Sequence, residues 1–175
     1  DFVNTLGLAA TGINGWTVIA STEAVDARDN TNSNINIDGV GTAIFLLDGT
    51  TNIANNYAEL WEGGFNPART ININITEDGT KLNTGSAWTG STSSGTLSAD
   101  LGLGSGQGLG QAGDIQDENC CSFWVSSSLT TLDHTLHLYA LSDTITVQEV
   151  PEPAALTLFA LGLAGLGLAR HKLRR

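Results

Sequence analysis

The chain has 175 residues, enough for one domain of ordinary size and a short appendage. Seven Lys and Arg stand against 18 Asp and Glu, and four of the seven basic residues lie in the last six positions. The first 150 residues are therefore strongly acidic and would repel a phosphate backbone, which argues against nucleic acid as a partner.

The start of the chain is informative through what it lacks. The sequence contains no Met, so we expect residue 1 not to be a translation start. Residues 1–10 show no charged and then apolar leader, and we expect any export signal to lie upstream. Residues 1–12 are expected to hold the end of a helix.

Short apolar runs separated by Gly, Asn, Asp and Ser predict strands in the first half of the chain. The first two are residues 15–20 (GWTVIA) and residues 42–47 (TAIFLL), the second ended by Asp48 and Gly49. Residues 70–76 (TININIT) alternate strictly, which predicts a half-buried strand with Ile on its inner face and Asn on its outer face. A turn at residues 77–79 would close that strand.

Residues 53–61 (IANNYAELW) form the best helical stretch. Asp48 or Thr50 is available to cap it. Its apolar face would consist of Ile53, Tyr57 and either Leu60 or Trp61.

The second half of the chain predicts further strands at residues 86–90, 122–125 and 135–147. Residues 101–113 (LGLGSGQGLGQAG) are so rich in Gly that we expect a loop too flexible to form an element. No repeat of 20–50 residues is visible, which argues against a solenoid. These elements together predict an α+β fold, with an all-β sandwich as the alternative.

Two letter patterns suggest sites that their contexts do not support. His134 and His137 form an H-x-x-H, but on a strand residues three apart face opposite sides, so a metal pair is not expected. Residues 108–113 fit G-x-G-x-x-G, but no strand precedes and no helix follows, so we interpret the match as chance.

An acidic loop is the one candidate for a metal. Oxygen ligands with such spacing could hold Ca²⁺, although they do not follow the EF-hand pattern, and a solvated acidic loop is the commoner explanation. The candidate ligands are Asp114, Asp117, Glu118 and Asn119.

Four Trp residues are expected mostly in the core, and one exposed Trp beside Asn and Asp would suit stacking on a sugar. They are Trp16, Trp61, Trp88 and Trp124. Cys120 and Cys121 are adjacent, so we do not expect them to bridge each other. We expect two half-buried thiols or one pairing with a cysteine upstream. A dyad of Cys121 with a His can be written down, but nothing visible lowers the pKa of that thiol.

The last 26 residues have three parts in fixed order. The entry is Val150, Pro151, Glu152 and Pro153, in which two prolines fix an extended backbone. Residues 154–169 follow without a charge, and their apolar side chains include Ala154, Leu158, Phe159, Leu161, Leu163, Leu166 and Leu168. The basic end consists of Arg170, Lys172, Arg174 and Arg175.

This pattern predicts a membrane-anchoring helix. Sixteen helical residues span about 24 Å, somewhat less than the ~30 Å hydrocarbon core. The terminal cations would stay in the cytoplasm and place the acidic body outside. The alternative is a buried helix of the domain, but such a helix would normally have a polar face.

Pro-Glu-Pro, an apolar helix and a basic end resemble the PEP-CTERM sorting signal of Gram-negative, often biofilm-forming bacteria. The resemblance implies recognition by an exosortase, a membrane transpeptidase, with cleavage near residues 151–153. The chain would be the substrate in that reaction, held transiently in the inner membrane. The mature protein would then reach the cell surface or the extracellular polymer.

The body resembles bacterial relatives of the endostatin and C-type-lectin-like fold, a family of surface domains. The resemblance rests on short motifs, chiefly Trp88-Thr89-Gly90-Ser91 and Leu138-Tyr139. That family usually begins with a strand and a helix that this sequence does not contain before Asp1. It also often has paired cysteines, which this sequence lacks unless they lie upstream. The resemblance therefore implies a truncated copy.

These observations predict an acidic extracellular domain over residues 1–148, a linker over 149–153, a transmembrane helix over 154–169 and a cytoplasmic basic tail over 170–175. No catalytic constellation is visible, and we expect a non-catalytic module that binds glycan, such as exopolysaccharide, or protein. The alternatives are an exported hydrolase that acts on an envelope or matrix polymer and a purely structural matrix component. No cofactor other than the candidate Ca²⁺ is expected.

Overall fold

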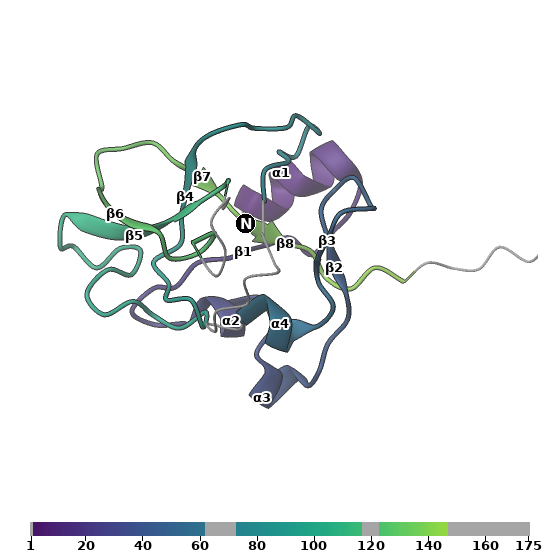
Figure 1. Ribbon diagram of the computed structural model, residues 1–175, viewed down its shortest axis with the longest axis horizontal. Helices are drawn as coiled ribbons and strands as arrows, with labels where there is room; N and C mark the ends of the chain where they lie inside the picture. Colours follow the sequence, from purple (N-terminus) through teal and green to yellow (C-terminus); the bar gives the residue numbers. More distant parts are fainter. Residues whose placement is uncertain (1, 62–72, 117–122, 147–175) are drawn as a thin grey trace, which may run out of the picture. The chain divides into compact units, whose positions relative to one another are not determined.

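The computed structural model describes residues 2–61, 73–116 and 123–146. These residues form both helices and strands, as the α+β prediction requires (Figure 1). The helices are α1 (Phe2–Thr11), α2 (Ala27–Asn30), α3 (Ile35–Asp38) and α4 (Tyr57–Trp61). The strands are β1 (Thr17–Val18), β2 (Ile44–Phe45), β3 (Asn52–Ala54), β4 (Ser86–Trp88), β5 (Leu109–Asp114), β6 (Ser128–Thr131), β7 (His137–Leu138) and β8 (Ala140–Leu141).

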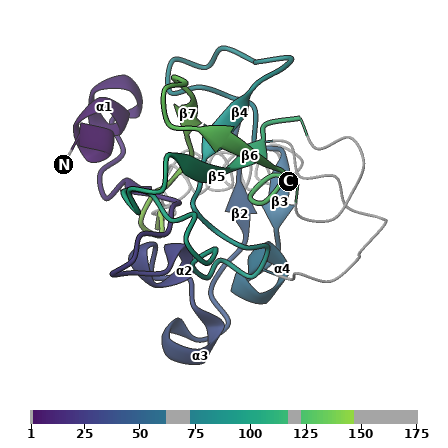
Figure 2. The ribbon, with the colours of Figure 1, turned by 90° about the vertical axis from the view of Figure 1, so that its left-hand side faces the viewer.

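The described strands form one mixed sheet of four strands and two antiparallel pairs. The sheet has the order β6-β5-β4-β7, in which only β4 and β7 run parallel. The pairs are β1 with β8 and β2 with β3. Figure 2 views the side on which β5 and β6 lie. Because β7 and β8 are separated only by Tyr139, that residue joins the sheet to the β1–β8 pair.

Strand β5 lies inside the sheet, although its sequence is LGQAGD. Its Gly113 pairs with Ala87 on β4, and a Cβ at Gly113 would lie 1.8 Å from the Trp124 carbonyl oxygen. Residues next to Trp124 also bond to this strand, since the Asp114 N–H donates to the Phe123 carbonyl at 2.7 Å. Glycine is therefore needed here for close approach of two backbones, and the expectation of a flexible loop is wrong from residue 109 onward.

That close approach brings Trp124 into the core. Its ring centroid lies 5.6 Å from that of Trp61 and 5.8 Å from that of Tyr139, and all three side chains are buried. Such tilted aromatic pairs add to the free energy of burial. The Trp61 indole N–H donates to the hydroxyl of Ser33 at 2.8 Å, which satisfies its polar group inside the core.

Buried hydroxyl groups connect this core to the loops around it. The Thr89 hydroxyl donates to the Val125 carbonyl at 2.6 Å, and the hydroxyl oxygens of Ser21 and Ser91 lie 2.8 Å apart. The Ser21 oxygen also accepts from the Ala27 N–H at the start of α2. Thr89, Ser91 and Ser21 are fully buried, so each of these bonds avoids the cost of an unpaired polar group.

Most predicted elements of the first half are present in shorter form. Strands β1 and β2 lie inside the two predicted strands, and α1 confirms the helix expected at the start. The helix predicted over residues 53–61 is wrong in its first part, because β3 covers Asn52–Ala54 and α4 begins at Tyr57. Neither expected cap is used: Asn56 accepts the Glu59 N–H at 2.9 Å and so caps α4.

Two strand predictions are wrong in the described residues. Residues 73–76 form only an isolated bridge between Ile75 and Lys81, and Asn74, expected on the outer face, is 4% exposed. The turn after them is present, since the Gly79 N–H donates to the Thr76 carbonyl at 2.9 Å. Residues 123–125 of the strand expected over 122–125 form a turn whose backbone bonds to β5.

The strand prediction over residues 86–90 is confirmed by β4, and that over 135–147 is confirmed in part by β7 and β8. The predicted segment is divided into two strands because each part pairs with a different strand. Strand β7 pairs with β4, whereas β8 pairs with β1.

We predict that Gly113→Ala lowers the free energy of unfolding by about 3 kcal/mol, because a Cβ would meet backbone that cannot easily move. Chemical denaturation followed by Trp fluorescence measures this change. Gly12→Ala is the control, since Gly12 directly follows α1 with a φ of 73° and open space around it. It should lose only about 1 kcal/mol from left-handed strain. Equal losses for the two variants would contradict the close approach of the two backbones.

Candidate functional site

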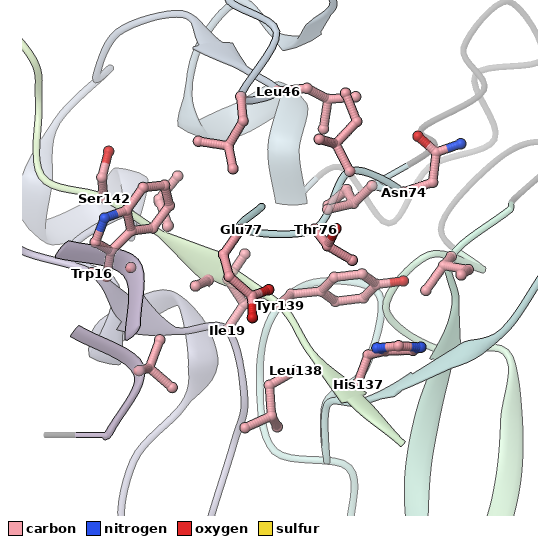
Figure 3. Close-up of a pocket in the computed structure, with 18 of the residues that line it drawn as sticks. Trp16, Ile19, Leu46, Asn74, Thr76, Glu77, His137, Leu138, Tyr139 and Ser142 are labelled. Atoms are coloured by element: carbon pink, nitrogen blue, oxygen red, sulfur yellow. The ribbon is translucent and has the colours of Figure 1, made fainter. Parts of the chain in front are cut away.

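A cavity of about 370 Å³ opens beside the core and is the candidate site (Figure 3). Four segments surround it: α1, residues 44–47 from β2 onward, residues 73–77 and residues 136–142. Its lining is mainly aliphatic and aromatic. A concave apolar site of this size with a few polar groups is the usual form of a ligand pocket. We call it the apolar groove.

The β2–β3 turn shapes one wall of the groove. The Asp48 carboxylate accepts the N–H groups of Thr50 and Thr51 at 2.9 and 2.8 Å, together with the Thr51 hydroxyl at 2.5 Å. The turn closes with the Leu46 N–H bonded to the Thr51 carbonyl at 3.0 Å. Because the turn is held by a side chain at its own tip, Leu46 and Leu47 keep their place against the cavity.

Residues 73–82 form the second wall by a similar device. The Leu82 N–H donates to the Asn74 carbonyl at 2.8 Å, which draws the two ends of this segment together. At its tip, Asp78 accepts the Thr76 hydroxyl at 2.6 Å and the Thr80 N–H at 2.9 Å. Ile73 and Ile75 line the cavity even though the regular strand is absent.

Tyr139 lies at the base of the groove, between Trp16 and His137 in Figure 3. It is 3% exposed, and its backbone carbonyl accepts the Ile19 N–H at 2.9 Å. Because the same ring packs on Trp124, the floor of the groove is part of the rigid core.

Helix α1 and Trp16 close another side. A Cβ at Gly7 would lie 2.4 Å from the Trp16 ring, so the helix backbone rests directly on the indole. The Trp16 N–H donates to the Asn4 side chain at 3.0 Å, and its indole N–H donates to the Ile13 carbonyl at 2.8 Å. Trp16 is therefore held from both ends while it lines the cavity.

Two carboxylates lie at the groove. Glu77 lines the cavity, and the Asp143 carboxylate lies against Gly15, next to the lining Trp16. Asp48 and Asp78 hold the tips of the two wall turns. Bonds from the Thr51 hydroxyl and backbone, and from the Thr50 backbone, lower the pKa of Asp48 from 3.8 to about 2. The bond from the Thr76 hydroxyl likewise lowers the pKa of Asp78. Both carboxylates thus remain ionised well into the acidic range.

The groove contains only some of the residues that the sequence analysis singled out. Trp16 and His137 line it, whereas Trp61 and Trp124 are core residues, as expected for most of the Trp side chains. Trp88 is half-buried on β4. The sequence carried a partial signal for the groove in its apolar run at residues 42–47. It carried none for the contribution of residues 136–142, which depends on how distant strands pair.

The remaining predicted sites lie elsewhere. His134 is in the turn before β7, apart from the strand that holds His137. Residues 108–113 belong mainly to β5 and are not followed by a helix in the described part of the chain, so their G-x-G-x-x-G lacks the context of a dinucleotide site. In residues 2–61, 73–116 and 123–146 no group of three His, Cys, Asp or Glu is placed to hold a metal.

Several candidates fall outside the described residues. Asp114 ends β5 and accepts the Gln116 N–H at 2.9 Å, but its three expected partners in a calcium site lie in the segment 117–122, with both cysteines. The calcium site stays a prediction. The sorting signal, the apolar helix and the basic end lie in residues 147–175, also outside. Within the described part, none of the helices has the length and apolar character that crossing a membrane requires.

We predict that Thr51→Val raises the pKa of Asp48 from about 2 toward 3.8, because the largest single stabilisation of the carboxylate is removed. A ¹³C NMR titration of the Asp48 carboxyl measures the change. In the folded wild type this carboxylate favours folding above pH 3.8, and that contribution is lost as the pH falls toward 2. An unchanged midpoint in the variant would contradict the proposed turn geometry. Thr5→Val is the control, since Thr5 lies on α1, outside this turn.

Comparison with known families adds one finding to this geometry. Residues 149–175 match the model of the PEP-CTERM protein-sorting motif. The match covers the three-part tail and does not extend to the body. No curated protein matches the chain.

Proposed function

We propose that this chain, which carries a PEP-CTERM protein-sorting motif at its C-terminus, is an exported surface protein whose acidic body is a non-catalytic binding module. The motif is associated with processing by an exosortase, and it suggests export with a membrane-anchored sorting stage. The finer parts of this proposal concern the fate of the tail and the role of the body.

The tail supports a temporary anchor. Its apolar run of residues 154–169 is somewhat short for a permanent span, and the basic residues after it would hold its end in the cytoplasm. After cleavage near residues 151–153, the body would be released to the cell surface or the extracellular polymer. In this scheme the acidic domain covers residues 1–148.

The apolar groove supports a binding role for the body. It is a formed concavity with a rigid floor, whereas no cluster of three acidic, His or Cys side chains suited to a metal occurs in the described part of the chain. Among the described residues, His137 is the one titratable base that lines it, and Glu77 is the one carboxylate. We infer a site that holds a ligand without transforming it.

The C-type-lectin-like fold remains our proposal for the body. Its two short motifs meet in space, because Trp88 pairs with Leu138 between β4 and β7. Thr89 and Ser91 of the first motif are buried in the hydroxyl network, and a Cβ at Gly90 would lie 2.4 Å from the Ser21 carbonyl oxygen. The motif therefore has a structural role, which is what a marker of a fold requires.

We predict that the surface form of the protein ends near residues 151–153, and that deletion of the exosortase leaves the basic tail attached. Mass spectrometry of the C-terminal peptide in fractionated cells measures both. Glu152→Ala should slow processing, since it alters the Pro-Glu-Pro entry. Glu149→Ala, a neighbouring acidic residue before that entry, serves as the control. A surface form that still ends in Arg175 would contradict the proposal.

A further inference from the structure

The apolar groove continues into a set of exposed apolar side chains at its edge. Phe2 is 71% exposed, Phe45 is 49% exposed and Leu138 is 44% exposed, and all three line the cavity. They come from α1, β2 and β7, which are far apart in the sequence. An apolar patch continuous with a pocket marks an interaction surface more strongly than scattered exposed residues do.

Among the described residues, the charged side chain that lines the groove is a carboxylate. Glu77 points into the cavity in Figure 3, and the Asp143 carboxylate lies against Gly15, next to the lining Trp16. No Lys or Arg of the described residues lines the groove. A ligand with a negative group would therefore meet repulsion, and one with positive groups would meet attraction.

We propose that the apolar groove binds a peptide segment of a partner protein in which apolar side chains alternate with Lys or Arg. The apolar side chains enter the cavity over Tyr139 and displace water from its aliphatic walls. The cations face Glu77 and Asp143. This assignment rests on the proposed role of the body as a binding module and names the chemistry of its ligand.

A purely polar ligand fits these observations less well. A sugar would use polar groups of the groove such as those of Asn74, Thr76 and His137, but would leave the larger apolar surface unfilled. An apolar acid, such as a fatty acid, would fill the cavity but bring its carboxylate close to that of Glu77. A ligand that is both apolar and cationic uses both features.

The test is titration calorimetry with the full chain in zwitterionic lipid nanodiscs, with empty nanodiscs subtracted. Three synthetic peptides of equal length serve as probes: a Leu/Lys peptide, a Leu/Glu peptide and a Ser/Lys peptide. We expect the Leu/Lys peptide to bind, with an affinity that falls as salt is added. The other two should bind at least about tenfold more weakly. Equal binding of the Leu/Glu peptide, or no binding of the Leu/Lys peptide, would overturn the proposal.

Two pairs of variants locate the binding. Leu138→Ser should lower the affinity for the Leu/Lys peptide about tenfold, since Leu138 on β7 lines the groove. Leu129→Ser changes a similarly exposed Leu on β6, at the other edge of the same sheet, and should leave affinity unchanged. Glu77→Gln should weaken binding about two- to fivefold, whereas Glu23→Gln, which is not among the lining residues, should not. Circular dichroism establishes that all four variants fold, and equal effects within either pair would overturn the proposal.

The groove could also be occupied by a second copy of the chain, and a further measurement distinguishes this from binding of a partner peptide. Sedimentation of the same nanodisc sample at several concentrations should show a single species. A dimer that Leu138→Ser dissociates and Leu129→Ser does not would overturn the proposal in favour of self-association. Because calorimetry does not depend on the fate of residues 150–175, its failure is separate from a failure of the processing experiment.

Discussion

The close contact between β5 and the backbone at Trp124 is the constraint on which the core depends. Gly113 has no room for a Cβ beside the Trp124 carbonyl, so these two backbones touch only because the strand carries glycine there. The contact places the Trp124 ring within packing distance of both Trp61 and Tyr139. Tyr139 in turn forms the base of the groove, so the position of the candidate site depends on a glycine that is not itself one of the lining residues.

This core is small, and hydrogen bonds between buried polar groups help to stabilise it in addition to apolar packing. Many of its apolar residues are Ala, and fully buried hydroxyl groups lie among them. These hydroxyls bond across boundaries between segments, as Thr89 does to Val125. These directional hydrogen bonds fix the loops in place relative to one another, and they help to keep the floor of the groove rigid.

Sequence reasoning was most successful where one segment determined its own structure. The Asp48-Gly49 turn, the turn at residues 77–79 and the strand at residues 86–88 depend on local patterns, and all are present. It failed where the structure of a segment depends on contacts with residues distant in the sequence. Strand β5 looked like a loop because its glycines are explained only by distant neighbours: Gly113 by the Trp124 backbone and Gly110 by the Trp88 ring. The buried Asn74 contradicts the alternation of residues 70–76. The candidate site was predictable only in part for the same reason, since no local pattern joins Trp16 to Glu77 or to Leu138. The tail is the opposite case, because its three parts are contiguous and its PEP-CTERM character was readable from 26 residues, which the family model matches.

The tail and the body have separate roles in this proposal: the tail directs the protein to the surface, and the groove gives the body a ligand. The binding role of the groove is the central claim. Methyl NMR of the full chain in nanodiscs, with the Leu/Lys peptide added, tests it most directly. We expect the methyl signals of Ile44, Leu46 and Leu138 to shift while those of Ile37 and Leu129 stay in place. Shifts at Ile37 and Leu129 with none at the groove would contradict the claim.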